Sequence, residues 1–352
     1  MHTYAYGHDF GNAETCGMVF YNNKRLASSI PSATAQGTLQ RLESLGVVLD
    51  KKDYVFKPQN GPEEYIGKLA LTQSDKSSTG RGDISRYWST RSLQLLLTVA
   101  ASLIDDEEFG LSVVTGLPIQ TYINDAESRN RVKTALNGVH TFYLNNKKRT
   151  IHASVERVIM EGAGAIIAYG MKGNVRQGVI DIGGRTTDLF ASNGQTPINY
   201  MCDGKPLGVE LAADLLSANF QRLYGRPLNH DERRGILYAY PQYSNQPYPE
   251  IYVKGKQVTN LKELASQAIA SVGNDIASFV STTWNESEQS GGVASSFARV
   301  LLVGGGAYFF HEQIARTIPE VQLASHPEEA NALGYAALAE GQLQRRQNIR
   351  IA

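Results

Sequence analysis

The sequence has little that would place the protein in a membrane, in an oxidising compartment or along a nucleic acid. Only two of its 352 residues are cysteines, Cys16 and Cys202, without a disulfide framework or metal-ligand spacing. The longest apolar region, residues 93–104, is far shorter than a membrane span, and no basic and apolar signal precedes Asp9. Basic and acidic residues number 34 each, so the formal net charge is zero and a broad nucleic-acid-binding surface is not expected. We therefore expect a soluble, cytoplasmic protein.

The chain does have the length for two domains and a hydrophobic share typical of globular proteins. At 352 residues, 42% of them hydrophobic, two domains could each bury a core of their own. The remaining question is which segments carry the chemistry.

One stretch, residues 179–189, combines a buried strand with a glycine turn. Residues 179–182 form an apolar run interrupted only by Asp181, and Gly183, Gly184, Thr186 and Thr187 follow. Glycine permits positive φ angles and lets backbone N–H groups approach an oxyanion, while an aspartate at a strand end can hold a hydrated metal ion. The pattern indicates phosphate and magnesium chemistry, although ordinary β-hairpins use the same residue types.

The chain contains this arrangement more than once. Near the N-terminus, Asp9 precedes Gly11, Asn12 and Ala13, and a strand-like run follows. A third apolar strand, residues 300–303, ends in three consecutive glycines. Two hairpins that face each other could clamp a polyphosphate and its metal ion, and the third turn could contact a flat nucleoside.

These three turns, in this order, resemble the actin, Hsp70 and sugar kinase superfamily of ATPases. Residues 9–12 match the first phosphate motif, 181–187 the second and 302–307 the adenosine motif, while residues 161–165 and 328–335 match the two connecting helices. The resemblance spans nearly the whole chain. Gly116, Leu117 and Pro118 after an apolar strand, together with Tyr122, are similar to the ParM-like branch of bacterial and archaeal actins.

The resemblance implies an α/β, two-lobed actin-like (ribonuclease H-like) fold with a nucleotide cleft between the lobes. Domain I would comprise residues 1–172 and 335–352, with a small subdomain inserted at about residues 32–108. Domain II would comprise residues 173–334. Within these domains we expect strands at residues 65–70 and 198–201, helices at 36–45 and 261–284, and a mobile loop at 80–83.

The resemblance also assigns roles to individual residues, with ATP or ADP and Mg²⁺ as cofactors. Backbone groups that would hold the phosphates belong to Gly11, Asn12, Ala13, Gly183, Gly184, Arg185 and Thr186. Asp9 and Asp181 would place Mg²⁺ through water, Asp188 would support the second hairpin, and Glu210 would contact the ribose. Gly304, Gly305 and Gly306 would line the base.

Glu161 matches the catalytic glutamate of ParM-like proteins. Hydrolysis needs a group that orients or deprotonates the attacking water, and a carboxylate at the start of a buried helix is placed to do so. A helix N-terminal carboxylate is also favoured by the macrodipole without any catalytic role. Both interpretations fit the sequence.

We therefore expect an ATPase that polymerises head to tail into filaments, for plasmid or DNA segregation or as a prokaryotic cytoskeleton. Its partners would be further copies of itself and a DNA-binding adaptor protein, with no direct contact to nucleic acid or membrane. A small-molecule kinase of the same fold and a non-filamentous ATPase that recruits partners remain the alternatives. Neither polymerisation nor cargo can be read from the residues.

Overall fold

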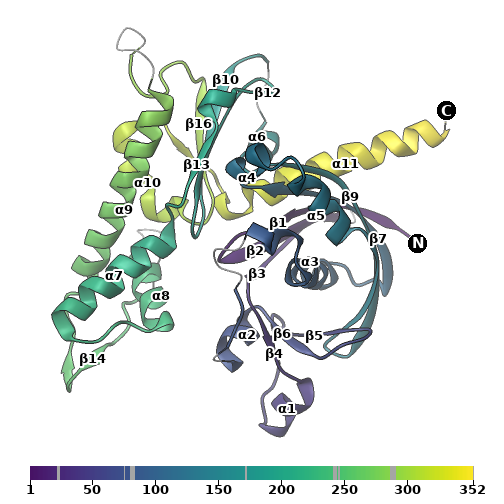
Figure 1. The fold of residues 1–352 in the computed structure, drawn as a ribbon, viewed down its shortest axis with the longest axis horizontal. Helices are drawn as coiled ribbons and strands as arrows, with labels where there is room; N and C mark the ends of the chain where they lie inside the picture. The colour runs from purple at the N-terminus through teal and green to yellow at the C-terminus, as the bar shows by residue number, and fades with distance from the viewer. Residues whose placement is uncertain are drawn as a thin grey trace. The chain divides into compact units, whose positions relative to one another are not determined.

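The computed structural model describes residues 1–21, 24–74, 76–79, 84–170, 173–240, 244, 246–285 and 291–351, with side chains up to Arg346. The chain forms two compact units (Figure 1). Unit 1 is Met1–Met171 with Glu328–Ala352, and unit 2 is Lys172–Pro327. The predicted loop at residues 80–83 lies outside the described residues.

Unit 1 is built on a nine-stranded sheet in the order β3-β2-β1-β7-β9-β8-β5-β6-β4. Its strands are β1 (Thr3–Asp9), β2 (Glu14–Tyr21), β3 (Lys24–Pro31), β4 (Thr34–Gln36), β5 (Tyr54–Pro58), β6 (Glu64–Ile66), β7 (Glu108–Leu117), β8 (Gly138–Leu144) and β9 (Lys147–Met160). β1, β7 and β9 are parallel neighbours, while β1–β2 and β8–β9 are antiparallel hairpins. The three parallel strands therefore end at one edge of the sheet.

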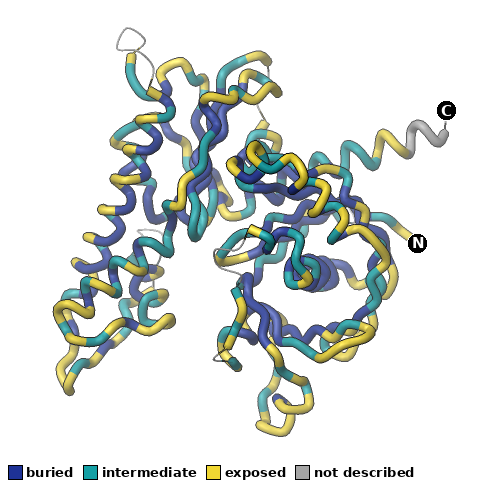
Figure 2. Tube along the Cα trace, viewed as in Figure 1, coloured by how far each residue is buried: buried dark blue, intermediate teal, exposed yellow. Residues whose placement is uncertain are grey.

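Helix α3 (Thr90–Leu103) forms the centre of the unit 1 core. It lies within the curve of the sheet, and most of it is buried (Figures 1 and 2). This explains why residues 93–104 are the most apolar run of the chain, because a helix that is buried on nearly all sides has no polar face. The other helical segments of unit 1 are α1 (Leu39–Ser44), α2 (Lys68–Gln73), η1 (Ile84–Trp88), α4 (Ile119–Asn124), α5 (Ser128–Leu136), α6 (Ala163–Tyr169) and α11 (Ala330–Ile351).

Part of the predicted insertion at 32–108 has a hydrophobic cluster of its own. A separate hydrophobic cluster, including Leu42, Tyr65 and Leu69, lies within residues 33–71. Helix α3, in contrast, contacts β2 and β3 and belongs to the main core. The predicted strand at residues 65–70 is confirmed only for its first two residues, since β6 ends at Ile66 and Gly67, with a φ of 68°, is the N-cap of helix α2. The helix predicted at 36–45 is confirmed as the shorter α1.

Unit 2 contains a six-stranded sheet in the order β12-β11-β10-β16-β17, with β13 paired to β11. The strands are β10 (Arg176–Ile182), β11 (Thr187–Asn193), β12 (Thr196–Pro197), β13 (Asp203–Lys205), β16 (Arg299–Val303) and β17 (Gln322–Leu323), and a two-stranded ribbon joins β14 (Tyr252–Val253) to β15 (Lys256–Gln257). The predicted strand at 198–201 is wrong: residues Asn199–Met201 form a 3₁₀ helix, η2, before the chain returns to β11 as β13.

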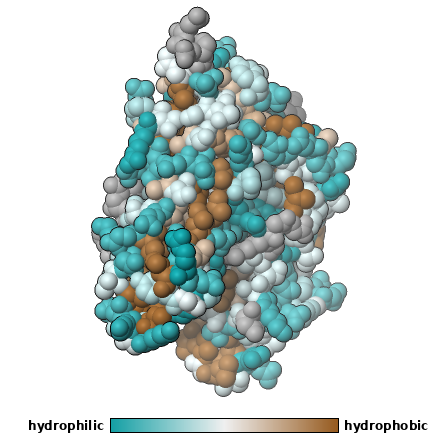
Figure 3. Space-filling model, turned by 60° about the vertical axis from the view of Figure 1, so that its left-hand side comes forward, coloured by the Kyte–Doolittle hydropathy of each residue, from teal (hydrophilic) through white to brown (hydrophobic). Residues whose placement is uncertain are grey.

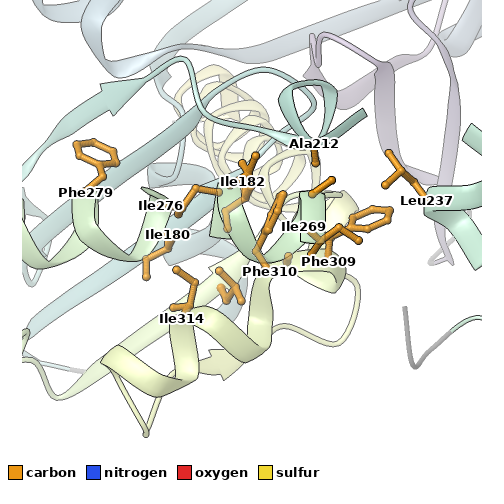
Figure 4. Close-up of a cluster of buried hydrophobic side chains, with 14 of the residues drawn as sticks. Ile180, Ile182, Ala212, Leu237, Ile269, Ile276, Phe279, Phe309, Phe310 and Ile314 are labelled. Carbon is orange, nitrogen blue, oxygen red and sulfur yellow. The ribbon is translucent and has the colours of Figure 1, made fainter. Parts of the chain in front are cut away.

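The helices of unit 2 are α7 (Val209–Tyr224), α8 (His230–Ala239), α9 (Leu261–Trp284) and α10 (Ala307–Thr317). In the core, Ile180 and Ile182 of the sheet pack with Ile269 and Ile276 of α9 and with Phe310 of α10 (Figure 4). Helix α9 has the predicted bounds because its apolar residues recur at three- and four-residue spacing. Its last residue, Trp284, is fully buried and donates from Nε1 to Met201 O at 2.8 Å.

The chain re-enters unit 1 at Glu328, before the predicted boundary at residue 335. The reason is that α11 packs against β1 and α6 from its first turn. A Cβ on Gly7 would lie 2.2 Å from Ala332 O, and one on Gly334 would lie 1.8 Å from Gly164 O. The described helices include none long and apolar enough to cross a membrane, and the face drawn in Figure 3 mixes hydrophilic with hydrophobic residues.

Candidate functional site

The β10–β11 hairpin and the end of β16 form one edge of the unit 2 sheet. β10 and β16 run parallel, with Asp181 opposite Val303, so their carboxyl ends lie side by side. Gly306 N donates to Ile182 O at 2.7 Å, and Gly304 N donates to Pro327 O at 2.8 Å. The structure therefore brings the second and third predicted turns together.

The hairpin turn, residues 183–186, has backbone donors that are not used by the protein. Gly183 N donates to Thr186 O at 2.8 Å, which closes the turn. The N–H groups of Gly184, Arg185 and Thr186 donate no hydrogen bond to any described residue. Successive unpaired N–H groups in a turn form a concave site for an anion. Four residues of this turn are predicted to contact phosphate, and the N–H groups of three of them, residues 184–186, donate to no described residue.

The first residues of α7 donate hydrogen bonds to carbonyl groups of the same turn. Val209 N and Glu210 N donate to Gly183 O and Gly184 O at 3.3 and 2.7 Å. A Cβ on Gly208 would lie 2.7 Å from both Arg185 N and Gly183 O, so only glycine permits this approach. Sequence reasoning did not select Gly208 as a site residue; its position directly before a helix is the signal that was available.

Two aspartates lie opposite each other on this hairpin. Asp181 of β10 and Asp188 of β11 are direct ladder partners, so their side chains share one face of the sheet, and both are buried. Buried carboxylates at opposite positions repel unless donors or a cation compensate their charge. Oxygen ligands of this kind suit Mg²⁺, which usually keeps several waters and is bound by one or two carboxylates and substrate phosphates. The residues thus fit the predicted ion.

The three glycines after β16 differ in what they do. Gly304 has a φ of 81°, and a Cβ there would lie 2.3 Å from Ile182 O. A Cβ on Gly306 would lie 2.5 Å from Ile182 Cγ2, whereas one on Gly305 would meet nothing within 4 Å. Gly304 and Gly306 therefore pack against the hairpin, and Gly305 is open to a ligand.

The first phosphate motif forms a second hairpin turn, at residues 10–13 of unit 1. Asp9 ends β1 opposite Cys16, and Ser32 fixes the turn by donating from Oγ to Gly11 O at 2.7 Å and from N to Ala13 O at 2.9 Å. Within the described chain, the N–H groups of Gly11, Asn12 and Ala13 donate no hydrogen bond. Ser32 was not predicted, because nothing in its sequence position links it to residues 10–13.

The positive φ that glycine permits occurs at Gly304 but not at the glycines of the two phosphate turns. Gly11, Gly183 and Gly184 are not among the glycines with positive φ. Close approach explains Gly11 instead, because a Cβ there would lie 2.1 Å from Glu14 O.

A buried histidine, His8, directly precedes Asp9 in β1. His8 is fully buried, with Nδ1 3.0 Å from Tyr6 Oη and Nε2 2.8 Å from Thr15 Oγ1. Thr15 Oγ1 also lies 2.9 Å from Asp9 O, to which it donates. Burial lowers the pKa of His8 to about 3, so its imidazole is neutral at physiological pH. This neutral network holds the end of β1 in place.

Glu161 lies at the same sheet edge as Asp9. β1, β7 and β9 are parallel, with His8 opposite Thr115 and Leu117 opposite Met160. Asp9, the last residue of β1, and Glu161, directly after β9, therefore lie at strand ends on the same edge. Glu161 N donates to Leu117 O at 2.9 Å, and the next residue, Gly162, donates to Asn331 Oδ1 of α11 at 3.1 Å. Glu161 precedes the start of helix α6, which begins at Ala163 after Gly162, whose φ is 83°.

Comparison with protein families supports the fold and the order of these turns. Residues 7–164 match the model for the N-terminal domain of actin like proteins, and residues 179–316 match the C-terminal model of the archaeal actin homologue, MreB-like. The chain is an actin-like protein. None of the curated proteins matches it.

Solved structures of actin-like proteins share the fold over almost the full chain. A subunit of a 15-stranded ParM filament from Clostridium botulinum superposes with a TM-score of 0.76 and 23% identity, covering 97% of this chain and 100% of that one. An archaeal actin homologue superposes with a TM-score of 0.74 and 22% identity, covering 97% of this chain and 100% of that one. The complex of that homologue with ADP superposes with a TM-score of 0.72 at the same identity and coverage. The predicted α/β, two-domain actin-like fold is thereby confirmed.

Proposed function

We propose that this actin-like protein binds and hydrolyses ATP through its three glycine turns. The observation that carries the proposal is a repeated one: two hairpin turns, each preceded by an aspartate, have three consecutive N–H groups that the described protein does not use. Such donors satisfy phosphate oxygens without any rearrangement of the backbone. The ADP complex of the archaeal homologue supports a nucleotide as the ligand.

The roles proposed for the individual residues follow from their positions. The N–H groups of residues 11–13 and 184–186 hold phosphate oxygens, and Gly305 lies against the base. Asp9 and Asp181 would hold Mg²⁺, and this ion would neutralise charge that develops on the phosphates. Glu161, at the edge where β1 and β9 end, accepts a hydrogen bond from the attacking water and orients it.

We further propose that the nucleotide controls assembly into filaments. The fold similarity to a ParM filament subunit supports head-to-tail assembly, a heterologous contact that does not close and therefore continues indefinitely. Plasmid or other DNA segregation through a DNA-binding adaptor protein is the role that fits such a filament, with a prokaryotic cytoskeleton as the related possibility.

The test is right-angle light scattering of the purified protein after addition of Mg-ATP or Mg-ADP, with phosphate release measured in parallel. Glu161→Ala is compared with the wild type and with Glu107→Ala, a control at an exposed carboxylate of the same unit. We expect scattering to rise with ATP and then decay in the wild type and the control. In Glu161→Ala the rise should persist, because one misplaced water-orienting group slows hydrolysis by about 10²–10⁴-fold.

Two outcomes would contradict the proposal in different ways. ATP binding without any rise in scattering would reject filament formation and favour an ATPase that recruits partners. Phosphate release that is unchanged in Glu161→Ala would reject the role of Glu161 while leaving ATP binding in place.

A further inference from the structure

Three hydroxyl groups from different parts of unit 1 donate hydrogen bonds to backbone carbonyl groups at the first phosphate turn. They are Thr115 Oγ1 of β7, which donates to His8 O at 2.6 Å, Thr15 Oγ1 of β2, which donates to Asp9 O at 2.9 Å, and Ser32 Oγ, which donates to Gly11 O at 2.7 Å. These bonds fix the direction in which the carbonyl groups point. The donor to Asp9 O, Thr15, is itself held by a further side chain, His8.

The His8 ring lies between two hydroxyl groups in the interior of unit 1. Its Nδ1 is 3.0 Å from Tyr6 Oη, and its Nε2 is 2.8 Å from Thr15 Oγ1. All three residues are fully buried. Burial keeps an imidazole neutral, and a neutral imidazole has one nitrogen that donates and one that accepts.

The carbonyl group of Asp9 determines which nitrogen of His8 donates. A carbonyl oxygen can only accept, so the single hydroxyl hydrogen of Thr15 points to Asp9 O. Thr15 Oγ1 is then an acceptor towards the ring, and Nε2 must carry the ring proton. Nδ1 is left as the acceptor, and Tyr6 Oη donates to it. The hydrogen bonds therefore run in one direction, from Tyr6 through His8 and Thr15 to Asp9 O.

The other tautomer of His8 would reverse this chain. With the proton on Nδ1, the ring would donate to Tyr6 Oη, and Nε2 would need the hydroxyl hydrogen of Thr15. Asp9 O would then lose the Thr15 donor. The tautomer of a buried ring thus decides whether the last peptide of β1 is held by this bond.

We propose that His8, as the Nε2–H tautomer, is a positioning residue for Asp9. Its N–H keeps the Thr15 hydroxyl turned to Asp9 O, and so fixes the peptide from which the Asp9 carboxylate and the phosphate turn extend. This inference rests on the proposed nucleotide binding, in which Asp9 would hold Mg²⁺. Hydrogen bonds behind a metal ligand orient it and strengthen binding of the ion.

The first experiment determines the tautomer by NMR of the full chain at neutral pH. Long-range ¹H–¹⁵N correlations of ¹⁵N-histidine-labelled protein show which ring nitrogen is protonated, and the His8 signals are those lost in His8→Gln. We expect Nε2–H in the wild type. In Thr15→Val we expect Nδ1–H, because Nε2–H would be buried without its acceptor, whereas Nδ1–H can donate to Tyr6 Oη.

The second experiment is isothermal titration calorimetry with ADP, in Mg²⁺ and in EDTA. Thr15→Val should lower the affinity by about tenfold in Mg²⁺, the usual size of a loss behind a metal ligand, and by less than about threefold in EDTA. Thr15→Ser restores the hydroxyl group. It should therefore keep the Nε2–H tautomer and stay within about threefold of the wild-type affinity in both conditions.

The matched control is Thr98→Val. Thr98 of α3 is fully buried, as Thr15 is, but its Oγ1 has no hydrogen-bond partner among the described residues. The same change of hydroxyl to methyl at this position should leave the His8 tautomer and both affinities at their wild-type values. A loss of affinity in Thr98→Val equal to that in Thr15→Val would overturn the inference.

The remaining outcomes separate this inference from the function beneath it. An Nδ1–H tautomer in the wild type would overturn it, and so would a loss in Thr15→Val that is equal in Mg²⁺ and EDTA, or no loss; nucleotide binding would stand in each case. A wild-type affinity that is independent of Mg²⁺ would reject the role of Asp9 together with this inference. A wild type that binds no ADP would overturn both proposals.

Discussion

Gly304 and Gly305 are adjacent in sequence but have different physical roles in the turn after β16. Gly304 combines a φ of 81° with a Cβ position 2.3 Å from Ile182 O, whereas the Cβ position of Gly305 is open. We expect Gly304→Ala to lower the free energy of unfolding by at least about 2 kcal/mol, from the left-handed backbone and the clash together. Gly305→Ala should stay within about 0.5 kcal/mol of the wild type. Urea unfolding measures both.

Equal effects of the two alanines would mean that the turn relaxes and that the close contact with Ile182 is not a constraint. A methyl group on Gly305 should instead weaken nucleotide binding if this residue lies against the base, which titration of the same variant with Mg-ADP would show.

His8 predicts a pH dependence of stability. Burial lowers its pKa to about 3 in the folded protein, against an ordinary value near 6.5. Between these values the unfolded chain binds a proton that the folded chain does not, so the unfolding free energy decreases as pH falls. The slope from this group approaches about 1.4 kcal/mol per pH unit. Above pH 6.5 its contribution is fully present.

Urea unfolding at pH 7.5 and pH 5 should therefore show a smaller loss of stability in His8→Gln than in the wild type. His140→Gln, at a half-buried histidine whose ring contacts Leu136 O, is the control. In NMR spectra, the ring signals of His8 should not titrate between pH 8 and 5. Titration with an ordinary pKa would contradict the buried neutral network.

At the scale of elements, helix α11 contains glycines under opposite constraints. A Cβ on Gly334 would lie 1.8 Å from Gly164 O of α6, while one on Gly341 would meet nothing within 4 Å. Gly341→Ala should raise the unfolding free energy by about 0.5–1 kcal/mol, because alanine restricts the unfolded chain and favours the helix. Gly334→Ala should lower it by about 1–3 kcal/mol, because α6 and α11 must separate.

Thermal unfolding of the two variants should move the midpoint in opposite directions. A stabilising Gly334→Ala would show that the helices do not pack as closely as the structure has them. The prediction concerns packing within unit 1 and does not depend on nucleotide.

The elements themselves divide into those that their own sequence determines and those that tertiary contacts decide. Helix α9 follows from the spacing of its apolar residues, and β10 from its apolar run before a glycine turn. The segments after β6 and around η2 do not, because short apolar runs fit a strand or a helix equally well. Gly67 and the pairing of β13 with β11 decide between them.

At the scale of the whole molecule, the proposed head-to-tail assembly predicts a critical concentration. An open heterologous interface adds subunits without limit once monomer exceeds a threshold. In sedimentation with Mg-AMP-PNP, the supernatant concentration should therefore reach a plateau as total protein rises, while with Mg-ADP it should follow the total. A supernatant that rises in proportion with AMP-PNP, or a closed oligomer of fixed mass, would reject an open filament.

The sequence by itself determined the family, the fold class and the order of the glycine turns. The aspartate and glycine turns could be predicted from residue types alone, because glycine permits close backbone contacts and carboxylates at strand ends can bind cations. These are local properties that need no knowledge of distant residues. The candidate residues Asp9, Asp181 and Glu161 could therefore be named before the fold was known.

Only the tertiary structure decided which groups in those turns are available to a ligand. Gly183 N donates within its own turn to Thr186 O, and Gly304 N and Gly306 N donate to Pro327 O and Ile182 O, whereas the N–H groups of residues 11–13 and 184–186 donate to no described residue. Ser32 became visible only through its contact with Gly11 O, and the close approach of Gly208 to the second turn is likewise a property of the tertiary structure. Hydrogen bonds and close packing join residues that are far apart in sequence, so residue type alone cannot reveal which donors remain free.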